Sequence, residues 1–346
     1  MAAPGVVAEG YGNALTVVDA SSGKQLFNYQ DTAASSRFWW AATISHGVLY
    51  IGNKDGNLYA FATGSGGPPP PTGTPGPAAK GPVSKSWYFA EGKVGAGFSQ
   101  YLTLQNPDPT TDCSVSIQYL LGHGSPVSKT VTVPHASRLT ESVNADLGLP
   151  ASAASYQTDS AILSVSNASS CAGIVAERPM YFTNFLGVSS GTDVLGATQT
   201  AKSFYFADVP TGGGYASFLT ILNPPGNPVA TVTATFYAHG QQLGTALTQQ
   251  VGAGQRGTIG LPNGGALQHA AVMVTSSQPV VVERPTYFHN IPAGHAGLVS
   301  GAASLVGVPA PGTSWLFAEG YTGGQFQETL VLANFNTASA NATITL

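Results

Sequence analysis

Charged residues are scarce in this chain: Asp, Glu, Lys and Arg make up 8% of its 346 residues, and the formal net charge is -4. The 12 Lys and Arg residues are scattered along the sequence and form no basic stripe. Proteins that bind a phosphate backbone do so mainly through clustered positive charge. We therefore expect no nucleic-acid partner.

Long apolar runs are absent as well. The apolar stretches are short strand-like pieces such as residues 279–282, whereas a membrane helix needs about 18 consecutive apolar residues. We expect no membrane insertion. Residues 1–15 have neither the charged start nor the apolar core of a signal peptide, and we expect the chain to begin inside a domain.

Long helix-forming stretches of Glu, Lys, Leu and Ala are also missing, while Gly, Thr, Ser and Val are plentiful. This composition favours an all-β fold. With 43% hydrophobic residues, the chain has enough apolar side chains for roughly two to three packed domains.

One motif occurs three times: Trp-Tyr-Phe-Ala-Glu-Gly at 87–92, Phe-Tyr-Phe-Ala-Asp at 204–208 and Trp-Leu-Phe-Ala-Glu-Gly at 315–320. A second motif, Glu-Arg-Pro, occurs at 177–179 and again at 283–285. Recurrence at a nearly fixed period predicts tandem copies of one folding unit.

Each complete copy has the size and the strand pattern of an Ig-like β-sandwich. Alternation places Leu102, Leu104 and Asn106 on one face of a strand that ends at an Asn-Pro turn. We predict five segments: a strand-rich segment at 1–63, a Pro/Gly-rich linker at 64–83, sandwich repeats at 84–203 and 204–312, and a truncated third repeat at 313–346. The linker composition favours an extended, semi-rigid spacer.

The first segment contains a Gly-Lys turn within residues 19–29 and an Asp-Gly turn within residues 47–60. The Asp-Gly turn between alternating apolar runs predicts a hairpin. These stretches resemble the repeat of pyrroloquinoline-quinone-type β-propellers, although Phe27 stands where that family commonly has Trp. A Pro-containing strand start is also usual where this chain has residues 43–44. Since a propeller needs at least about four blades, the resemblance implies the last blades of a larger propeller.

Two cysteines are present, Cys113 and Cys171. When the two copies are overlaid, Cys113 falls on Ala230 and Cys171 falls on Ser277, so both occur in one copy and neither in the other. This joint presence predicts a disulfide, and with it an oxidising, extracellular setting. The alternative is a pair of unrelated buried thiols.

The Glu-Arg-Pro motif places charges inside an apolar strand, which is costly unless the charges are matched. One interpretation makes Arg178 or Arg284 a ligand-binding residue. The favoured interpretation is structural: the guanidinium stacks on Tyr181 or Trp87, pairs with an acid such as Glu91, and fixes the junction between successive units. The candidate junction residues are Glu91, Glu177, Arg178, Glu283 and Arg284.

Aromatic residues suggest a second kind of site. Exposed aromatic rings suit sugar binding, and the candidate ligand contacts are Trp87, Tyr88, Tyr181 and Tyr287; burial in sandwich cores accounts for such residues equally well.

No catalytic residue is expected. Residues 187–191 match Gly-x-Ser-x-Gly around Ser189, but no helical sequence follows and the second copy has Val299 at that place. His289 and His295 lack the further ligands that a zinc site needs, and Asp55 lacks the spacing of a calcium loop. We expect no metal and no cofactor.

The repeats resemble the Trp-Tyr-Phe-Ala-Glu-Gly modules that recur in large secreted bacterial proteins, and the resemblance covers residues 87–346. It implies a non-catalytic structural, adhesion or display region of a secreted or cell-surface protein. Partners would be a protein or glycan surface and neighbouring repeats of the same chain. Two alternatives stay open: the accessory tail of an exported enzyme, either a quinone-dependent dehydrogenase or a hydrolase, and a carbohydrate-binding module.

Overall fold

The computed structural model describes residues 2–3, 6–19, 22–32, 37–38, 43–45, 48–53, 58–62, 83–262, 269–292, 297–317, 320, 322 and 327–345. The chain divides into two compact units, Met1–Gly81 and Pro82–Leu346. All but the last residue of the predicted linker at 64–83 lie outside the described residues.

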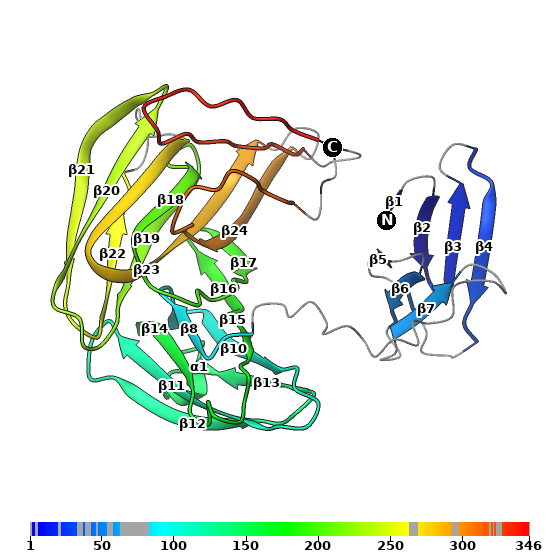
Figure 1. Cartoon of the computed structure of the whole chain (residues 1–346), viewed down its shortest axis with the longest axis horizontal. Coiled ribbons are helices and arrows are strands. Elements are labelled where there is room, and N and C mark those ends of the chain that lie inside the picture. The colour runs from blue at the N-terminus through cyan, green and yellow to red at the C-terminus, as the bar shows by residue number, and fades with distance from the viewer. Residues whose placement is uncertain are drawn as a thin grey trace. The chain divides into compact units, whose positions relative to one another are not determined.

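The first unit contains two small antiparallel sheets (Figure 1). One has the order β1 (Ala2–Ala3), β2 (Val6–Tyr11), β3 (Ala14–Asp19), β4 (Gln25–Gln30), and the other has β5 (Thr43–Ser45), β6 (Val48–Gly52), β7 (Leu58–Ala62). Antiparallel pairing of β6 with β7 confirms the predicted hairpin, whose turn at 54–57 is not among the described residues. Among the described residues, the buried apolar cluster of this unit consists of Ala8, Leu15, Phe38, Leu49 and Ile51.

The second unit begins with a set of strands that we call the first module (Figure 1). Its elements are β8 (Ser86–Phe89), β9 (Lys93–Gly95), β10 (Phe98–Asn106), β11 (Cys113–Leu121), β12 (Val127–Val133), β13 (Ser137–Ser142), α1 (Val143–Asp146), β14 (Tyr156–Val165), β15 (Val175–Glu177), β16 (Met180–Phe185) and β17 (Val188–Thr192). One layer has the order β12-β11-β14-β8, and in the other β10 pairs with β13, β15 and β16. β9 pairs with both β14 and β10 and so joins the layers.

The core of the first module follows from period-two alternation. In β10 every second side chain is buried, including Leu102, Leu104 and Asn106, as predicted from the sequence. Leu102 and Leu104 meet Val115 and Leu163 from the opposite layer in one apolar cluster. An all-antiparallel arrangement with its core between two layers fits a β-sandwich.

The strands that follow form the second module: β18 (Ala201–Val209), β19 (Tyr215–Asn223), β20 (Ala230–Ala238), β21 (Gln241–Val251), β22 (Gln255–Gly260), β23 (Ala270–Pro292) and β24 (Leu298–Val306). Their order is β21-β20-β23-β19-β22, with β18 and β24 also paired to β23. β18 begins before the predicted boundary at residue 204. The long β23 takes the places that β14, β15 and β16 hold in the first module.

Strand register is the same in the two modules at the recurring motifs. Thr103 in β10 stands opposite Glu177, and Thr220 in β19 stands opposite Glu283. Residues that align in the sequence therefore occupy equivalent positions in the two modules.

The asparagine that ends the β10-type strand makes the same bonds in each module. The Asn106 side-chain amide donates to the Val133 carbonyl at 3.0 Å, and that of Asn223 donates to the Val251 carbonyl at 3.0 Å. Asn334, at the aligned place in the third copy, accepts a backbone N–H two residues on at 3.0 Å, as Asn106 does at 3.1 Å. The turn is thus set locally by asparagine.

The third copy differs from expectation in one respect. Residues 329–334 align with the strands β10 and β19, and this alignment predicts a strand there, but the described part of 309–345 contains no strand. β10 and β19 are held by strands from later in their own modules, and 335–345 supplies no such partner. An isolated extended segment lacks the hydrogen bonds that stabilise a sheet.

Cys113 and Cys171 form a disulfide across a sequence separation of 58 residues, which confirms the predicted pairing. It ties the start of β11 to the loop before β15, and both residues are buried. Disulfides persist in oxidising compartments, which fits an extracellular setting.

Replacing both cysteines by the residues of the second module, Cys113→Ala with Cys171→Ser, should lower the free energy of unfolding by about 4 kcal/mol, because the unfolded chain regains the entropy of an open loop. Urea unfolding followed by tryptophan fluorescence measures the change. The double variant should show no further loss in reductant, whereas the parent chain should. An unchanged midpoint would contradict the prediction.

Candidate interaction surface

An arginine from the Glu-Arg-Pro motif of the first module lies buried against the second module. The Nη1 atom of Arg178 is 3.0 Å from the Oε2 atom of Glu283, and both side chains are fully buried. The favoured interpretation of the motif predicted an arginine at the junction. The acid that pairs with it is Glu283 of the next module, whereas Glu91, the example given from the sequence, accepts from Arg178 through its backbone carbonyl.

Three further hydrogen bonds surround this pair, while the buried Nε atom of Arg178 has no partner among the described residues. Oε1 of Glu283 accepts the backbone N–H of Ala90 at 2.6 Å. Arg178 also donates to the backbone carbonyl of Glu91, and its Nη2 atom donates to the Ser304 hydroxyl at 3.3 Å. The Phe-Ala-Glu and Glu-Arg-Pro motifs therefore meet in space.

A second ion pair crosses the same junction. Oε2 of Glu91 lies 3.2 Å from Nη2 of Arg256 in β22, and the two side chains are 9% and 8% exposed. Sequence reasoning missed Arg256. Its signal was recurrence: Arg138 holds the equivalent place in the first module, opposite Gln105 as Arg256 is opposite Leu222.

Burial sets the electrostatics of these charges. It raises the pKa of Glu91 above the usual value of 4.5, and the positive charges of Arg256 and Arg178 oppose the rise. Such a pair contributes little net stability, but removing one partner costs about 3 to 5 kcal/mol because the other charge stays buried. The network therefore favours one placement of the modules over all others.

Apolar contacts flank the ion pairs. The Tyr287 ring packs edge-on against Phe182 and Phe185, with centroids 5.2 and 4.8 Å apart, and such aromatic pairs contribute about 0.5 to 1.5 kcal/mol each. A second cluster joins buried residues of both modules: Ala90, Leu120, Leu222 and Val281.

The remaining candidate junction residues, Glu177 and Arg284, are differently placed. Glu177, the equivalent of Glu283, is exposed. Arg284 donates to the backbone carbonyl of Asp208, which repeats the arginine-to-carbonyl bond of the first module. Among the described residues no carboxylate forms an ion pair with Arg284. Each module thus carries the motif, but only one inter-module ion pair is formed from it within the described residues.

The candidate aromatic ligand contacts are mostly not at the surface. Trp87 is fully buried and its indole N–H donates to the Ile174 carbonyl at 2.9 Å. Tyr287 is buried in the junction and Tyr88 is half-buried. Burial in the core or the junction therefore removes Trp87 and Tyr287 as ligand contacts, whereas Tyr181 is 56% exposed.

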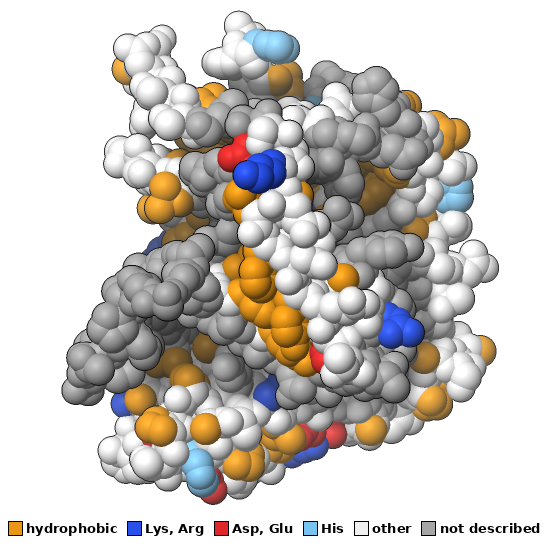
Figure 2. Space-filling view, turned by 90° about the vertical axis from the view of Figure 1, so that its right-hand side faces the viewer, with side chains coloured by type: hydrophobic (Ala, Val, Ile, Leu, Met, Phe, Trp, Pro, Cys, Tyr) orange, Lys and Arg blue, Asp and Glu red, His pale blue; other side chains and the backbone are white. Residues whose placement is uncertain are grey.

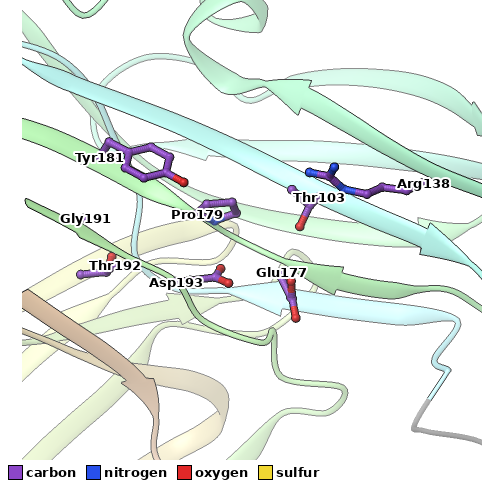
Figure 3. Close-up of a pocket in the computed structure, with 8 residues that line it drawn as sticks. All are labelled: Thr103, Arg138, Glu177, Pro179, Tyr181, Gly191, Thr192 and Asp193. Carbon is purple, nitrogen blue, oxygen red and sulfur yellow. The ribbon is translucent and has the colours of Figure 1, made fainter. Parts of the chain in front are cut away.

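Tyr181 belongs to an open pocket on the first module (Figure 3). The pocket has a volume of about 600 Å³. Figure 3 shows the carboxylates of Glu177 and Asp193 on one side and the Arg138 guanidinium on the other. The lining residues are Thr103, Arg138, Glu177, Pro179, Tyr181, Gly191, Thr192 and Asp193.

The pocket concentrates charge that is otherwise sparse. Figure 2 shows few and scattered Lys, Arg, Asp and Glu side chains among the described residues on the face in view. Two carboxylates and a guanidinium line this one pocket.

The motifs considered for a catalytic serine and for metal binding are not accompanied by suitable neighbouring residues among those described. Ser189 lies within β17, where its hydroxyl accepts the Asn184 backbone N–H at 3.0 Å, and no described helix follows it. His295 and Asp55 are not among the described residues. In the described part of the chain, no three His, Cys, Asp or Glu side chains gather as metal ligands would, and no helix there has the length and apolar character of a membrane span.

No protein-family model matches this chain, and no curated protein or solved structure is similar enough to count as a match.

A buried acid lies next to the junction. Asp159 is fully buried, accepts a bond from the Gln100 amide at 3.0 Å, and has no partner for its second oxygen among the described residues. A Cβ on Gly92 would lie 2.5 Å from the Asp159 carboxylate, which accounts for glycine at the end of this motif. Burial raises the pKa of Asp159 from its usual 3.8 to about 6.

The raised pKa of Asp159 predicts a pH-dependent stability. The folded chain holds this proton up to about pH 6 while the unfolded chain releases it near pH 4, so stability is lost as pH rises through this window. Asp159→Asn should match the parent chain at pH 4 and exceed its free energy of unfolding by up to about 3 kcal/mol at pH 8. Urea unfolding at pH 4, 6 and 8 tests this; an advantage that does not change with pH would refute it.

Proposed function

We propose that the chain is a non-catalytic structural and display region of a secreted or cell-surface bacterial multidomain protein. In this proposal the two modules are tandem Ig-like β-sandwich repeats, and the first unit represents the last blades of a quinoprotein-like β-propeller. The modules hold a partner-binding part of the larger protein in a fixed direction.

The observation that carries the proposal is the fully buried Arg178–Glu283 ion pair between modules. A spacer made of loosely linked domains needs no such contact, because inter-domain contacts in flexible chains are small and polar. A buried charge is tolerated only when its partner is in place. The pair therefore supports a stiff connection, which is what a display region needs.

The same structural role is compatible with an accessory tail of an exported enzyme. The carbohydrate-binding alternative has one specific observation in its favour: the exposed Tyr181 beside the carboxylates of Glu177 and Asp193. Aromatic rings with adjacent polar groups suit sugars.

The stiffness of the junction can be measured directly. Spin labels on cysteines introduced at Thr132 and Gln250, both exposed on edge strands, should give one narrow distance distribution. Arg178→Met should broaden it and lower the free energy of unfolding by about 3 to 5 kcal/mol, because Glu283 is left buried without its partner.

Arg284→Met is the matched control, since Arg284 holds the same place in the motif but has no ion-pair partner among the described residues. It should leave the distribution narrow. A broad distribution in the parent chain would overturn the proposal.

Glycan-array binding by the full chain tests the alternative. Sugar binding that is lost in Tyr181→Ala, with an unchanged melting temperature, would favour the carbohydrate-binding module; absence of binding would leave the structural role as the better account.

A further inference from the structure

The pocket of the first module is the open equivalent of a surface that is covered in the second module. We call this set of equivalent positions the acceptor surface of each module. By strand register, the residues of the first module Thr103, Arg138, Glu177, Tyr181 and Asp193 correspond in the second module to Thr220, Arg256, Glu283, Tyr287 and Ser304.

In the second module three members of the acceptor surface, Arg256, Glu283 and Ser304, have a partner from the first module, whereas the Thr220 hydroxyl donates to the Glu283 carbonyl of its own module. Glu283 and Ser304 bind Arg178, and Arg256 binds the Glu91 carboxylate.

In the first module, by contrast, the acceptor surface faces solvent. Arg138, Glu177, Tyr181 and Asp193 are all exposed, and they surround the pocket (Figure 3). The described part of the chain forms no ion pair with Arg138, Glu177 or Asp193. The first module therefore carries the charged groups of one side of a module junction, and no described residue supplies the groups of the other side.

The complementary half is present on the second module. In the first module the surface that enters the acceptor, which we call the inserting surface, consists of Ala90, Glu91, Arg178, Phe182 and Phe185. The second module has at these places Ala207, Asp208, Arg284, Phe288 and Ile291. An acid, an arginine and two large apolar side chains are thus kept in the same order.

A third segment of the chain already lies on this side of the second module. The Phe335 ring packs 5.0 Å from Tyr205 and 6.0 Å from Tyr237, between ring centroids. Tyr205 and Tyr237 correspond to Tyr88 and Leu120, which in the first module belong to the cluster that packs on the second module. The acid of the inserting surface, Asp208, keeps a side chain that is 28% exposed.

We propose that the acceptor surface of the first module binds the inserting surface of the second module of another copy of this chain, head to tail. Glu177 and Asp193 receive the guanidinium of Arg284, and Arg138 receives the carboxylate of Asp208. The interface joins two different surfaces, so it is heterologous and leaves one free surface of each kind on every pair, to which further copies can add in a row or a ring. This inference rests on the equivalence of the modules in the proposed function and adds the partner.

Sedimentation velocity of the full chain, over about two orders of magnitude in concentration, tests the proposal. The parent chain should show a mean mass that rises with concentration. Glu177→Arg places like charge against Arg284 and should weaken the association at least about tenfold. Arg284→Glu should do the same. An equimolar mixture of the two variants should regain the association of the parent chain, because alternating copies restore opposite charges at every interface.

Thr132→Arg is the control: it adds an arginine at an exposed position of β12, on the other layer of the module, and should leave association unchanged. A parent chain that stays monomeric, or association that Glu177→Arg does not weaken, overturns the proposal. Neither result depends on the folding of the Arg284→Glu chain. If the spin-label distances stay narrow while the chain is monomeric, the self-association fails and the structural role stands.

Discussion

The arrangement of the second unit depends on one buried guanidinium. Arg178 loses all contact with water, which is tolerable only because its two Nη atoms find three acceptors: the Glu283 carboxylate, the Glu91 carbonyl and the Ser304 hydroxyl. Two of these acceptors belong to the second module. A rotation of one module against the other would leave the Arg178 charge buried without its partner. The cost of about 3 to 5 kcal/mol in free energy exceeds what loose apolar contact would contribute.

Apolar and ionic groups contribute differently to the junction because they differ in directionality. The aromatic cluster around Tyr287 and the aliphatic cluster around Leu222 remove area from water, but burial of area is non-directional and allows many placements. Ion pairs and hydrogen bonds have narrow geometry and select one placement among them. Because only 8% of residues are charged, few alternative partners compete for this selection.

The sequence predicted much of this architecture because its signals are local. Alternation places Leu102 and Leu104 in the core, and the loss of both cysteines together in one copy predicts the disulfide. No local sequence signal identifies the residue of the next module that pairs with Arg178. Glu177 and Glu283 stand in the same motif, yet one is exposed and the other fully buried. That difference is set by what lies against each module, which a single module's sequence does not encode.

The open acceptor surface and its edge are more polar than the covered ones. Asp193 stands where the covered surface has Ser304, and Gln105, opposite Arg138, stands where the second module has Leu222, opposite Arg256. An exposed leucine has an unfavourable contact with water that Gln105 avoids, and a second carboxylate adds attraction for an arginine while raising the cost of desolvation. A surface changed in this way keeps the selectivity of the junction but gives up part of its apolar contact area. Such a surface suits a reversible contact between separate chains. The junction within the chain is instead held by both ionic and apolar interactions, and the covalent connection keeps its two halves at high effective concentration.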